Sequence, residues 1–274
     1  MQPNIVPYLV LASAYAALAV IGWRRLWAIR APGSPTWIYE LERAALPLLL
    51  LAHAILLRQS VWGDAGININ FTTALAVVAW LATLFYWLHS LWQAQPGLSA
   101  MVLPVAAIGA LIGGWPMSPR WLPYAGQPLA TLHIVIALLA YGLFLVAAVQ
   151  ALLLMTVERR LHHGGSNLLT QAIPPLLTME QALFRQIALA FLLLTITVVS
   201  GMLFSDLLFQ KPVRLTHHVL FSLLAWLVFA GLLFGRRRFG WRGRTALRWV
   251  LAGTVMLLLA YFGAKFVSEV VLGR

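Results

Sequence analysis

The sequence contains no cysteine, and this absence removes a whole class of chemistry. Disulfides, thiolate metal ligands, cysteine nucleophiles and attachment of a cofactor through the protein's own sulfur are excluded. Charged residues are scarce too, at 9% of the chain, and only seven residues are acidic. The motifs of hydrolases, phosphate-binding loops and dinucleotide-binding domains are also missing. We therefore expect a protein that is not an enzyme.

The few carboxylates stand at the ends of apolar segments or in the loops between them. They are Glu40, Glu42, Asp64, Glu158, Glu180, Asp206 and Glu269. Pathways for protons or metal ions through a membrane usually depend on intramembrane carboxylates. Ion transport is therefore disfavoured. Transport of a small molecule is the weakest of the functions considered below, because Gln150 and a few hydroxyl groups are the polar side chains available near the midplane.

Apolar sequence is what the chain has in abundance, since 62% of its 274 residues are hydrophobic. Continuous runs of about 18 or more apolar residues recur along the whole length, and each predicts a transmembrane helix. We expect an all-α polytopic membrane protein in which residues 1–274 form a single transmembrane domain of about eight helices. The expected helices are Ile5 to Trp23, Leu41 to Val61, Phe71 to Trp92, Leu98 to Trp115, Pro128 to Val157, Ala182 to Leu208, Leu215 to Gly235 and Ala246 to Val267.

The formal charge of +12 invites a nucleic-acid interpretation, but basic residues in a membrane protein mostly report its orientation. Thirteen of the 19 lysines and arginines flank loops on one side, including the cluster from Arg236 to Arg248. The positive-inside rule places this side in the cytoplasm and both termini outside. The cluster is expected to contact anionic lipid, so the bilayer is an expected partner and nucleic acid is not. Because Met1 to Pro7 carries no basic stretch, we expect the first helix to be retained and not cleaved as a signal peptide.

Histidines stand out in these segments, because an ionisable side chain in hydrocarbon is costly and marks a functional-site hypothesis by default. At about 1.5 Å per residue, His133 lies roughly 8 Å below the outer surface, His217 lies at a similar or smaller depth, and His53 lies roughly 12 Å down. His218 points about 100° away from its neighbour His217, so we expect at most one of the pair to be a ligand. The remaining histidines belong to the inner side: His89, His162 and His163.

An outer group of imidazoles on different helices is what a haem iron requires, because its axial ligands come from facing elements. His133 is the first candidate for a haem-iron ligand, His217 the second and His53 the third. Tyr141 shares a helix face with His133 and would offer an aromatic wall beside the macrocycle. The outer cations available to haem propionates are Arg58, Arg120, Lys211 and Arg214.

A different interpretation of the same histidines stays open. A single histidine in a membrane helix often makes an interhelical hydrogen bond worth about 1 kcal/mol or less. The small residues next to His133 also suit close helix packing. The chain would then be a cofactor-free accessory or regulatory protein that keeps the fold and acts through another membrane protein.

The second half of the chain carries short motifs in a fixed order. The first is a helix in which His133 is followed eight residues later by Tyr141. The others are Pro174-Pro-Leu-Leu-Thr-Met-Glu180 followed by Phe184-Arg185, Thr195 to Gly201, Trp226, Gly240-Trp-Arg-Gly-Arg244 and Tyr261-Phe-Gly263. With these motifs, residues 129–266 resemble the CcsA/HemX-type cytochrome c assembly family, and within it the bacterial inner-membrane branch known as YpjD.

The resemblance implies a multi-pass protein of the bacterial inner membrane that binds haem b and takes part in cytochrome c assembly. His133 matches the first outer histidine of the family. Members with the full pattern also present haem with a Trp-rich outer loop and a histidine after the last helix. Here the loop from Asp206 to Arg214 has no tryptophan, and residues 266–274 contain no histidine. We therefore predict that the protein binds and handles haem near the outer face, while delivery of haem to an apocytochrome is not carried over.

Overall fold

The computed structural model describes residues 5–28, 37–63, 66–93, 97–122, 127–162, 176–203 and 217–271. Within these ranges, seven helices are long and apolar enough to cross a membrane. They are α1 (Ile5–Ala28), α2 (Trp37–Val61), α3 (Phe71–Trp92), α5 (Pro128–His162), α7 (Leu176–Leu203), α9 (His217–Phe239) and α10 (Gly243–Leu258), which continues through the π-helical segments η1 (Leu259–Gly263) and η2 (Phe266–Val271). The prediction of a helical multi-pass chain is confirmed.

The remaining helix, α4 (Leu98–Gly113), is shorter and deeply packed. Its 16 residues span about 24 Å, which is less than the roughly 30 Å hydrocarbon core. It packs between α1 and α3, where Gly109 and Gly113 face Ala79 and Ala76 of α3. Small residues at such positions let helix backbones approach closely. Whether α4 counts as an eighth spanning helix stays a prediction.

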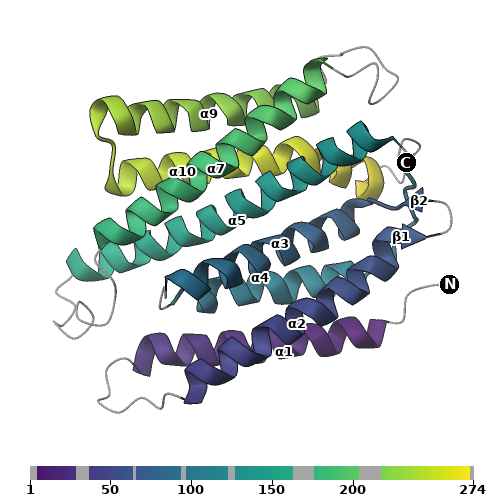
Figure 1. Ribbon diagram of the computed structural model, residues 1–274, viewed down its shortest axis with the longest axis horizontal. Coiled ribbons are helices and arrows are strands. Elements are labelled where there is room, and N and C mark those ends of the chain that lie inside the picture. The colour runs from purple at the N-terminus through teal and green to yellow at the C-terminus, as the bar shows by residue number, and fades with distance from the viewer. Residues whose placement is uncertain are drawn as a thin grey trace.

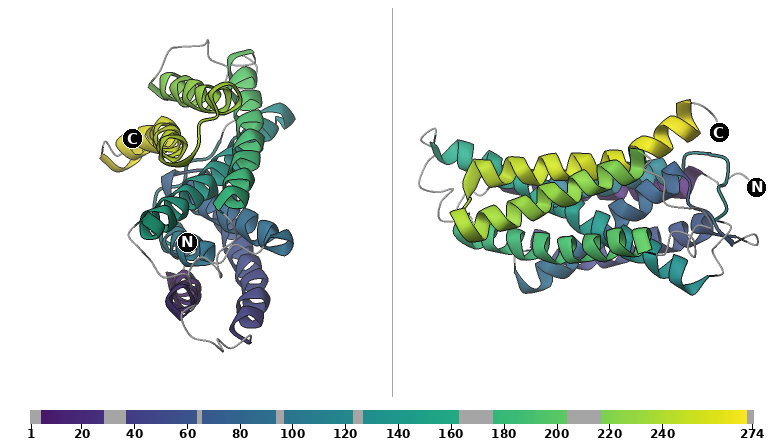
Figure 2. Two further views of the ribbon diagram at one scale, coloured as in Figure 1. Left: turned by 90° about the vertical axis from the view of Figure 1, so that its left-hand side faces the viewer. Right: turned by 90° about the horizontal axis from the view of Figure 1, so that it is seen from above.

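The helices run side by side in a bundle with α3 and α5 in its middle (Figure 1). Figure 2 shows α1 and α2 at one side of the bundle and α9 and α10 at the other. α5 packs on α3 with one face and on α7 and α10 with others, so it joins the two halves.

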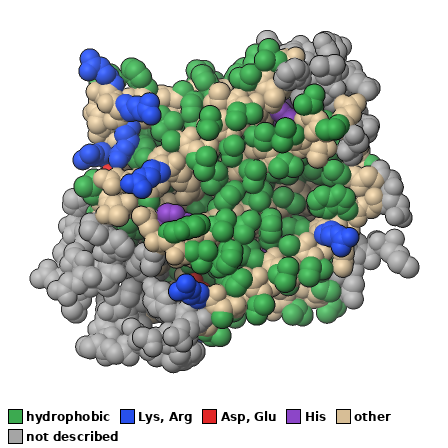
Figure 3. All heavy atoms as spheres, in the orientation of Figure 1, with side chains coloured by type: hydrophobic (Ala, Val, Ile, Leu, Met, Phe, Trp, Pro, Cys, Tyr) green, Lys and Arg blue, Asp and Glu red, His purple; other side chains and the backbone are tan. Residues whose placement is uncertain are grey.

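The two ends of the bundle differ in charge and in structure. The start of α1, the end of η2 and two short strands lie together at one end (Figure 1). Arg236, Arg237 and Arg238 end α9 at the opposite side, where Figure 3 shows several basic side chains beyond a broad hydrophobic face. We refer to these as the outer and the inner end, after the orientation that the charge distribution predicts.

The strands at the outer end were not predicted from the sequence. β1 (Trp62–Gly63) pairs antiparallel with β2 (Gly66–Ile67) directly after α2. The pair continues into a segment where Leu122 N–H donates to the Ile67 carbonyl (2.9 Å) and Asn68 bridges to Trp121. Residues 62–63, 66–69 and 118–122 therefore form a small hydrogen-bonded roof over the start of α3.

Several helices extend past the apolar runs that predict them. α5 runs on from Val157 to His162, and α7 begins at Leu176 instead of Ala182. Hydropathy marks the part of a helix that suits hydrocarbon, whereas backbone hydrogen bonds continue into polar sequence such as Glu158 and Arg159. The expected end at Leu208 and the expected start at Leu215 lie outside the described residues.

Candidate functional site

His133 is held by a hydrogen bond across the α5–α7 contact. Its Nδ1 atom lies 2.8 Å from the Ser200 hydroxyl oxygen, and that hydroxyl also lies within hydrogen-bond distance of the Thr197 carbonyl (3.1 Å). Either His133 Nδ1 or the Ser200 hydroxyl can donate in this contact, depending on the tautomer of the ring. The contact fixes the position of the imidazole against α7. Gly201 adjoins the ring, where an added Cβ would come 3.4 Å from Cε1.

A second imidazole comes from the neighbouring helix α9. This imidazole belongs to His218. Its ring meets Tyr261 of η1 edge-to-face, with centroids 6.0 Å apart. The His218 side chain is exposed and that of His133 is half-buried. The fold thus places one imidazole from α5 and one from α9 at the outer end, and neither is fully buried.

An aromatic cluster extends from these histidines into the bundle. Tyr261 lies 6.1 Å from Tyr141 and 5.2 Å from Phe262, measured between ring centroids. The Tyr141 hydroxyl donates to the Leu257 carbonyl (2.8 Å), which ties α5 to the end of α10. Tyr261 belongs to a π-helical turn, a feature frequent at functional sites. Tyr141 therefore sits in the aromatic wall expected of it, with its hydroxyl already used.

His53 lies elsewhere in the molecule. It is fully buried on α2, where its ring contacts Tyr15 of α1 at a centroid distance of 5.8 Å. Both of its ring nitrogens and the Tyr15 hydroxyl lack a hydrogen-bond partner among the described atoms. α2 packs on α1 and α3, whereas His133 faces α7. The structure does not bring His53 to the other two imidazoles.

The other predicted residues are only partly described. His217 begins α9, but its side chain lies outside the described part of the chain, and its role as a ligand stays a prediction. Arg214 and Lys211 also lie outside it. Arg120 is exposed in the roof, where its N–H donates to Asn68 Oδ1 (2.7 Å) and its carbonyl accepts from Ile69. No described contact places the Arg120 side chain at His133.

Sequence reasoning missed Ser200 and Tyr261 as site residues, and ranked His217 above His218. Ser200 adjoins Gly201 in a motif, but nothing in that pattern shows that its hydroxyl faces α5. The choice within the histidine pair depends on the rotation of α9 about its axis, which a uniformly apolar helix does not fix.

A polar cluster at the inner end joins two further motifs. Gly243 N–H donates to Glu180 Oε1 (2.7 Å), and the Arg236 guanidinium lies 3.8 Å from the other carboxylate oxygen. The same guanidinium stacks on the Phe184 ring at 3.7 Å. Glu180 and Phe184 on α7 thus clamp the turn between α9 and α10, which the positive φ of Gly243 (58°) permits.

A hydrogen bond in the middle of the bundle joins another pair of motif residues. Trp226 Nε1–H donates to the Thr195 hydroxyl (3.0 Å), linking α9 to α7. Together with the Tyr141–Tyr261 contact and the inner clamp, this bond shows that the ordered motifs are contact partners across helices.

Comparison with known proteins agrees with this arrangement. The family model described as cytochrome C assembly protein matches residues 42–272. The chain is 28% identical to the inner membrane protein YpjD of Escherichia coli (strain K12) over 257 residues, which cover 91% of this chain and 89% of that protein. It is 23% identical to the cytochrome c biogenesis protein CcsA of Synechococcus sp. (strain CC9902), covering 88% of both, and 24% identical to that of Parasynechococcus marenigrum (strain WH8102), covering 82% of both.

These similarities extend over nearly the whole bundle and not only over the half that carries the motifs. Together with the seven membrane-spanning helices, they identify a multi-pass protein of the bacterial inner membrane. They also support a role in cytochrome c biogenesis. The chain belongs to the cytochrome c assembly protein family.

Proposed function

We propose that the protein binds haem b at the outer end of the bundle, between α5, α7 and α9. His133 would supply one imidazole ligand, and a member of the His217–His218 pair would supply the other. The observation that carries this proposal is that His218 of α9 and Tyr141, which shares an α5 face with His133, both contact the Tyr261 ring. Facing helices are the arrangement from which a haem iron takes its axial ligands.

The residues present suit such a group. Among the described residues there is no cluster of three or more side chains that could hold a bare metal ion. A porphyrin supplies its own four nitrogens, so one or two imidazoles suffice. Ser200 holds the ring of His133 in place, as hydrogen-bonded outer groups do for metal-ligating histidines. When bound, haem would supply an iron whose reduction potential these ligands tune.

The role that follows is holding and passing on haem, without catalysis of bond formation. CcsA relatives are cytochrome c biogenesis proteins. Haem bound at the outer face of this protein would then be passed on during cytochrome c biogenesis. Haem and the bilayer are then the direct partners. The exposed position of His218 suits exchange of the group with a second protein.

The test is an absorption spectrum of the protein purified with haem available. We expect a Soret band that is lost in His133→Ala and is weakened or shifted in either His217→Ala or His218→Ala. His53→Ala serves as the matched control, because it removes a histidine from the same bundle but from the far side of α3. Absence of a Soret band in the unmodified protein, or an unchanged band in His133→Ala, contradicts the proposal.

A second candidate function draws on the His133–Ser200 hydrogen bond itself. An interhelical bond of this kind can serve packing alone, and the loop from Asp206 to Arg214 contains no tryptophan. A cofactor-free accessory protein that acts through a membrane partner would show no Soret band. Its His133→Ala variant would lose only the small stability of one interhelical hydrogen bond, about 1 kcal/mol.

A further inference from the structure

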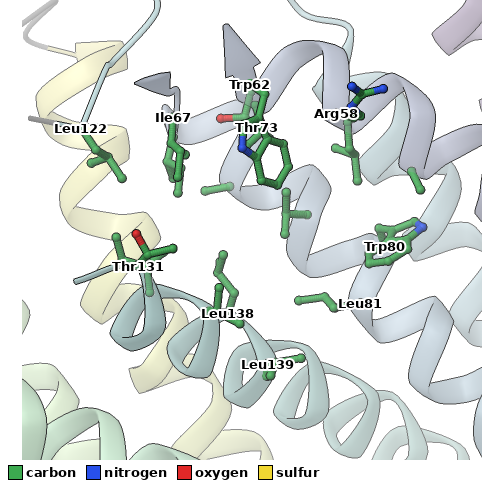
Figure 4. A pocket seen from close by; sticks show the side chains of 18 residues that line it. Arg58, Trp62, Ile67, Thr73, Trp80, Leu81, Leu122, Thr131, Leu138 and Leu139 are labelled. Carbon is green, nitrogen blue, oxygen red and sulfur yellow. The ribbon is translucent and has the colours of Figure 1, made fainter. Parts of the chain in front are cut away.

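The face of α5 that turns away from His133 borders an apolar cavity of about 330 Å³. The walls come from α2, α3 and α5, and the roof at the outer end closes the top. Figure 4 shows Trp62, Ile67 and Leu122 at the roof and Leu81 and Leu139 at the deep end. The volume lies at the lower end of the range of small-molecule sites, roughly 300–1,000 Å³.

The cavity is elongated along the helices. Its lining runs from Thr131 to Leu139 on α5 and from Thr73 to Leu81 on α3. Eight residues of helix correspond to about 12 Å, so the cavity reaches about 12 Å inward from the outer end. Since the helices cross the membrane, this long axis lies along the direction of the lipid chains.

The lining offers hydrocarbon and one charge. Arg58 is the charged residue among the residues that line the cavity, and it lies at the outer end with its side chain exposed. Thr73 and Trp80, two lining residues with polar groups, are hydrogen-bonded within the protein. The Thr73 hydroxyl donates to the Asn70 carbonyl (3.2 Å), and Trp80 Nε1–H donates to the Leu50 carbonyl (2.9 Å). A ligand therefore needs an apolar body and an anionic end.

The described residues leave a way in from the side of the bundle. Backbone hydrogen bonds from Leu122 to Ile67 and from Ile69 to Arg120 hold the roof together. α2 and α5 each pack on α3 more than on one another, and Val135, which lines the cavity on α5, is 46% exposed. The lateral side between α2 and α5 therefore faces lipid.

We propose that this cavity holds one acyl chain of an anionic phospholipid from the outer leaflet, with its phosphate paired to Arg58. The apolar lining, the alignment with the membrane normal, the lateral opening and the Arg58 cation at the mouth each fit this class of ligand. The site lies on the opposite face of α5 from the histidines, so it stands whether or not haem is bound.

The experiment measures quenching of tryptophan fluorescence by brominated lipid chains. The full-length protein is reconstituted in phosphatidylcholine vesicles containing a minor fraction of brominated phosphatidylglycerol, or the same fraction of brominated phosphatidylcholine. The difference between the unmodified protein and Trp80→Phe isolates the signal of Trp80, which lines the cavity. We expect this signal to be quenched more strongly by the anionic lipid.

Two pairs of variants sharpen the test. Ala54→Phe fills the cavity, while Ala52→Phe places the same side chain on the exposed face of α2. Arg58→Gln removes the charge at the mouth, while Arg24→Gln removes an exposed charge near the inner end. We expect Ala54→Phe to abolish the quenching of Trp80, and Arg58→Gln to lower the apparent affinity for the anionic lipid about fivefold. Both controls keep the behaviour of the unmodified protein.

The opposite outcomes overturn the proposal. Equal quenching by the two brominated lipids means that no anionic headgroup is recognised. Equal quenching in Ala54→Phe and Ala52→Phe means that no chain enters the cavity. Native mass spectrometry of protein released from mild detergent gives a second readout, in which a retained phospholipid must be lost in Ala54→Phe and kept in Ala52→Phe.

Discussion

His53 and His133 lie in opposite halves of one bundle, and their surroundings differ in almost every respect. His53 is sealed between α1 and α2 with both ring nitrogens unpartnered among the described atoms. His133 is half-buried and hydrogen-bonded to Ser200 on the neighbouring helix. The presence and depth of a histidine in a membrane helix therefore do not by themselves show whether it belongs to a site. What separates the two is that the His133 ring is partly accessible and held by a polar partner.

Close packing of small residues and side-chain hydrogen bonds both join the helices of the bundle. In the first half, α4 approaches α3 through Gly109 and Gly113, which face alanines. In the second half, side-chain hydrogen bonds such as Trp226–Thr195 link residues of the family motifs. Close packing of small residues tolerates little added volume, whereas a polar link fails when one partner is removed. Each kind of contact therefore predicts a different substitution that destabilises the bundle.

The largest effect is expected at the inner clamp of the second half. Glu180→Ala leaves Gly243 N–H without its acceptor and Arg236 without its counter-charge, and both side chains of the ion pair are largely buried. We expect a loss of about 3 kcal/mol in the free energy of unfolding, measured by denaturant titration in detergent micelles. Glu180→Gln retains an acceptor and should lose less.

Glu158→Ala is the matched control for the clamp. Glu158 lies 3.3 Å from Arg244, but the arginine side chain is 47% exposed, so solvent screens this pair. Its removal should lower stability far less than Glu180→Ala. Equal losses from the two substitutions would mean that the clamp is no stronger than a surface ion pair.

The next effect tests the small-residue packing of the first half. A Cβ at Gly109 would overlap that of Ala79, so Gly109→Ala should destabilise the bundle by about 1–3 kcal/mol. The same substitution at Gly231, in the second half, meets only Trp249 at an ordinary 3.4 Å and should be neutral or slightly stabilising. The thermal unfolding temperatures of the two variants provide the comparison, and the same shift in both would remove the contrast between the halves.

The third effect concerns the orientation of His133 and rests on the proposed haem site. Ser200→Ala removes the hydroxyl that holds the His133 ring, and loss of such a group typically lowers metal affinity at least tenfold. We expect haem titrations followed at the Soret band to show about tenfold weaker binding. Ser222→Ala, whose hydroxyl bonds only to the His218 carbonyl along α9, should bind haem normally. Undiminished affinity in Ser200→Ala would show that this hydrogen bond does not orient a ligand.

Much of the architecture could be predicted because hydrocarbon imposes it. The limits of α3, Phe71 to Trp92, follow from the apolar run alone. The roof could not be predicted, since Trp62, Gly63, Gly66 and Ile67 show no strand alternation, and residues 121–122, which pair with Ile67 and Asn68, are distant in sequence.

The candidate site was predictable in part. His133 and Tyr141 share a helix face whatever surrounds them, so helix geometry alone predicts that they lie on the same side of α5. The partners on α7 and α9 depend on how those helices are rotated about their axes. A helix that is apolar all round carries little information about its rotation, and this is why the contacts of Ser200 and Tyr261 were missed.

The smallest effect is expected at His53, where the comparison began. Replacing His53 by Leu removes two buried nitrogens that make no hydrogen bond to the described protein, and keeps an apolar side chain of comparable bulk. Burying an unsatisfied polar group costs about 1–3 kcal/mol, so His53→Leu should raise the free energy of unfolding by about 1 kcal/mol. Tyr15→Phe should act in the same direction, because it removes the neighbouring unpartnered hydroxyl. Both variants should keep the Soret band of the unmodified protein. Lower stability of His53→Leu, or loss of its Soret band, would instead indicate that His53 binds a ligand. The contrast between His53 and His133 would then be wrong.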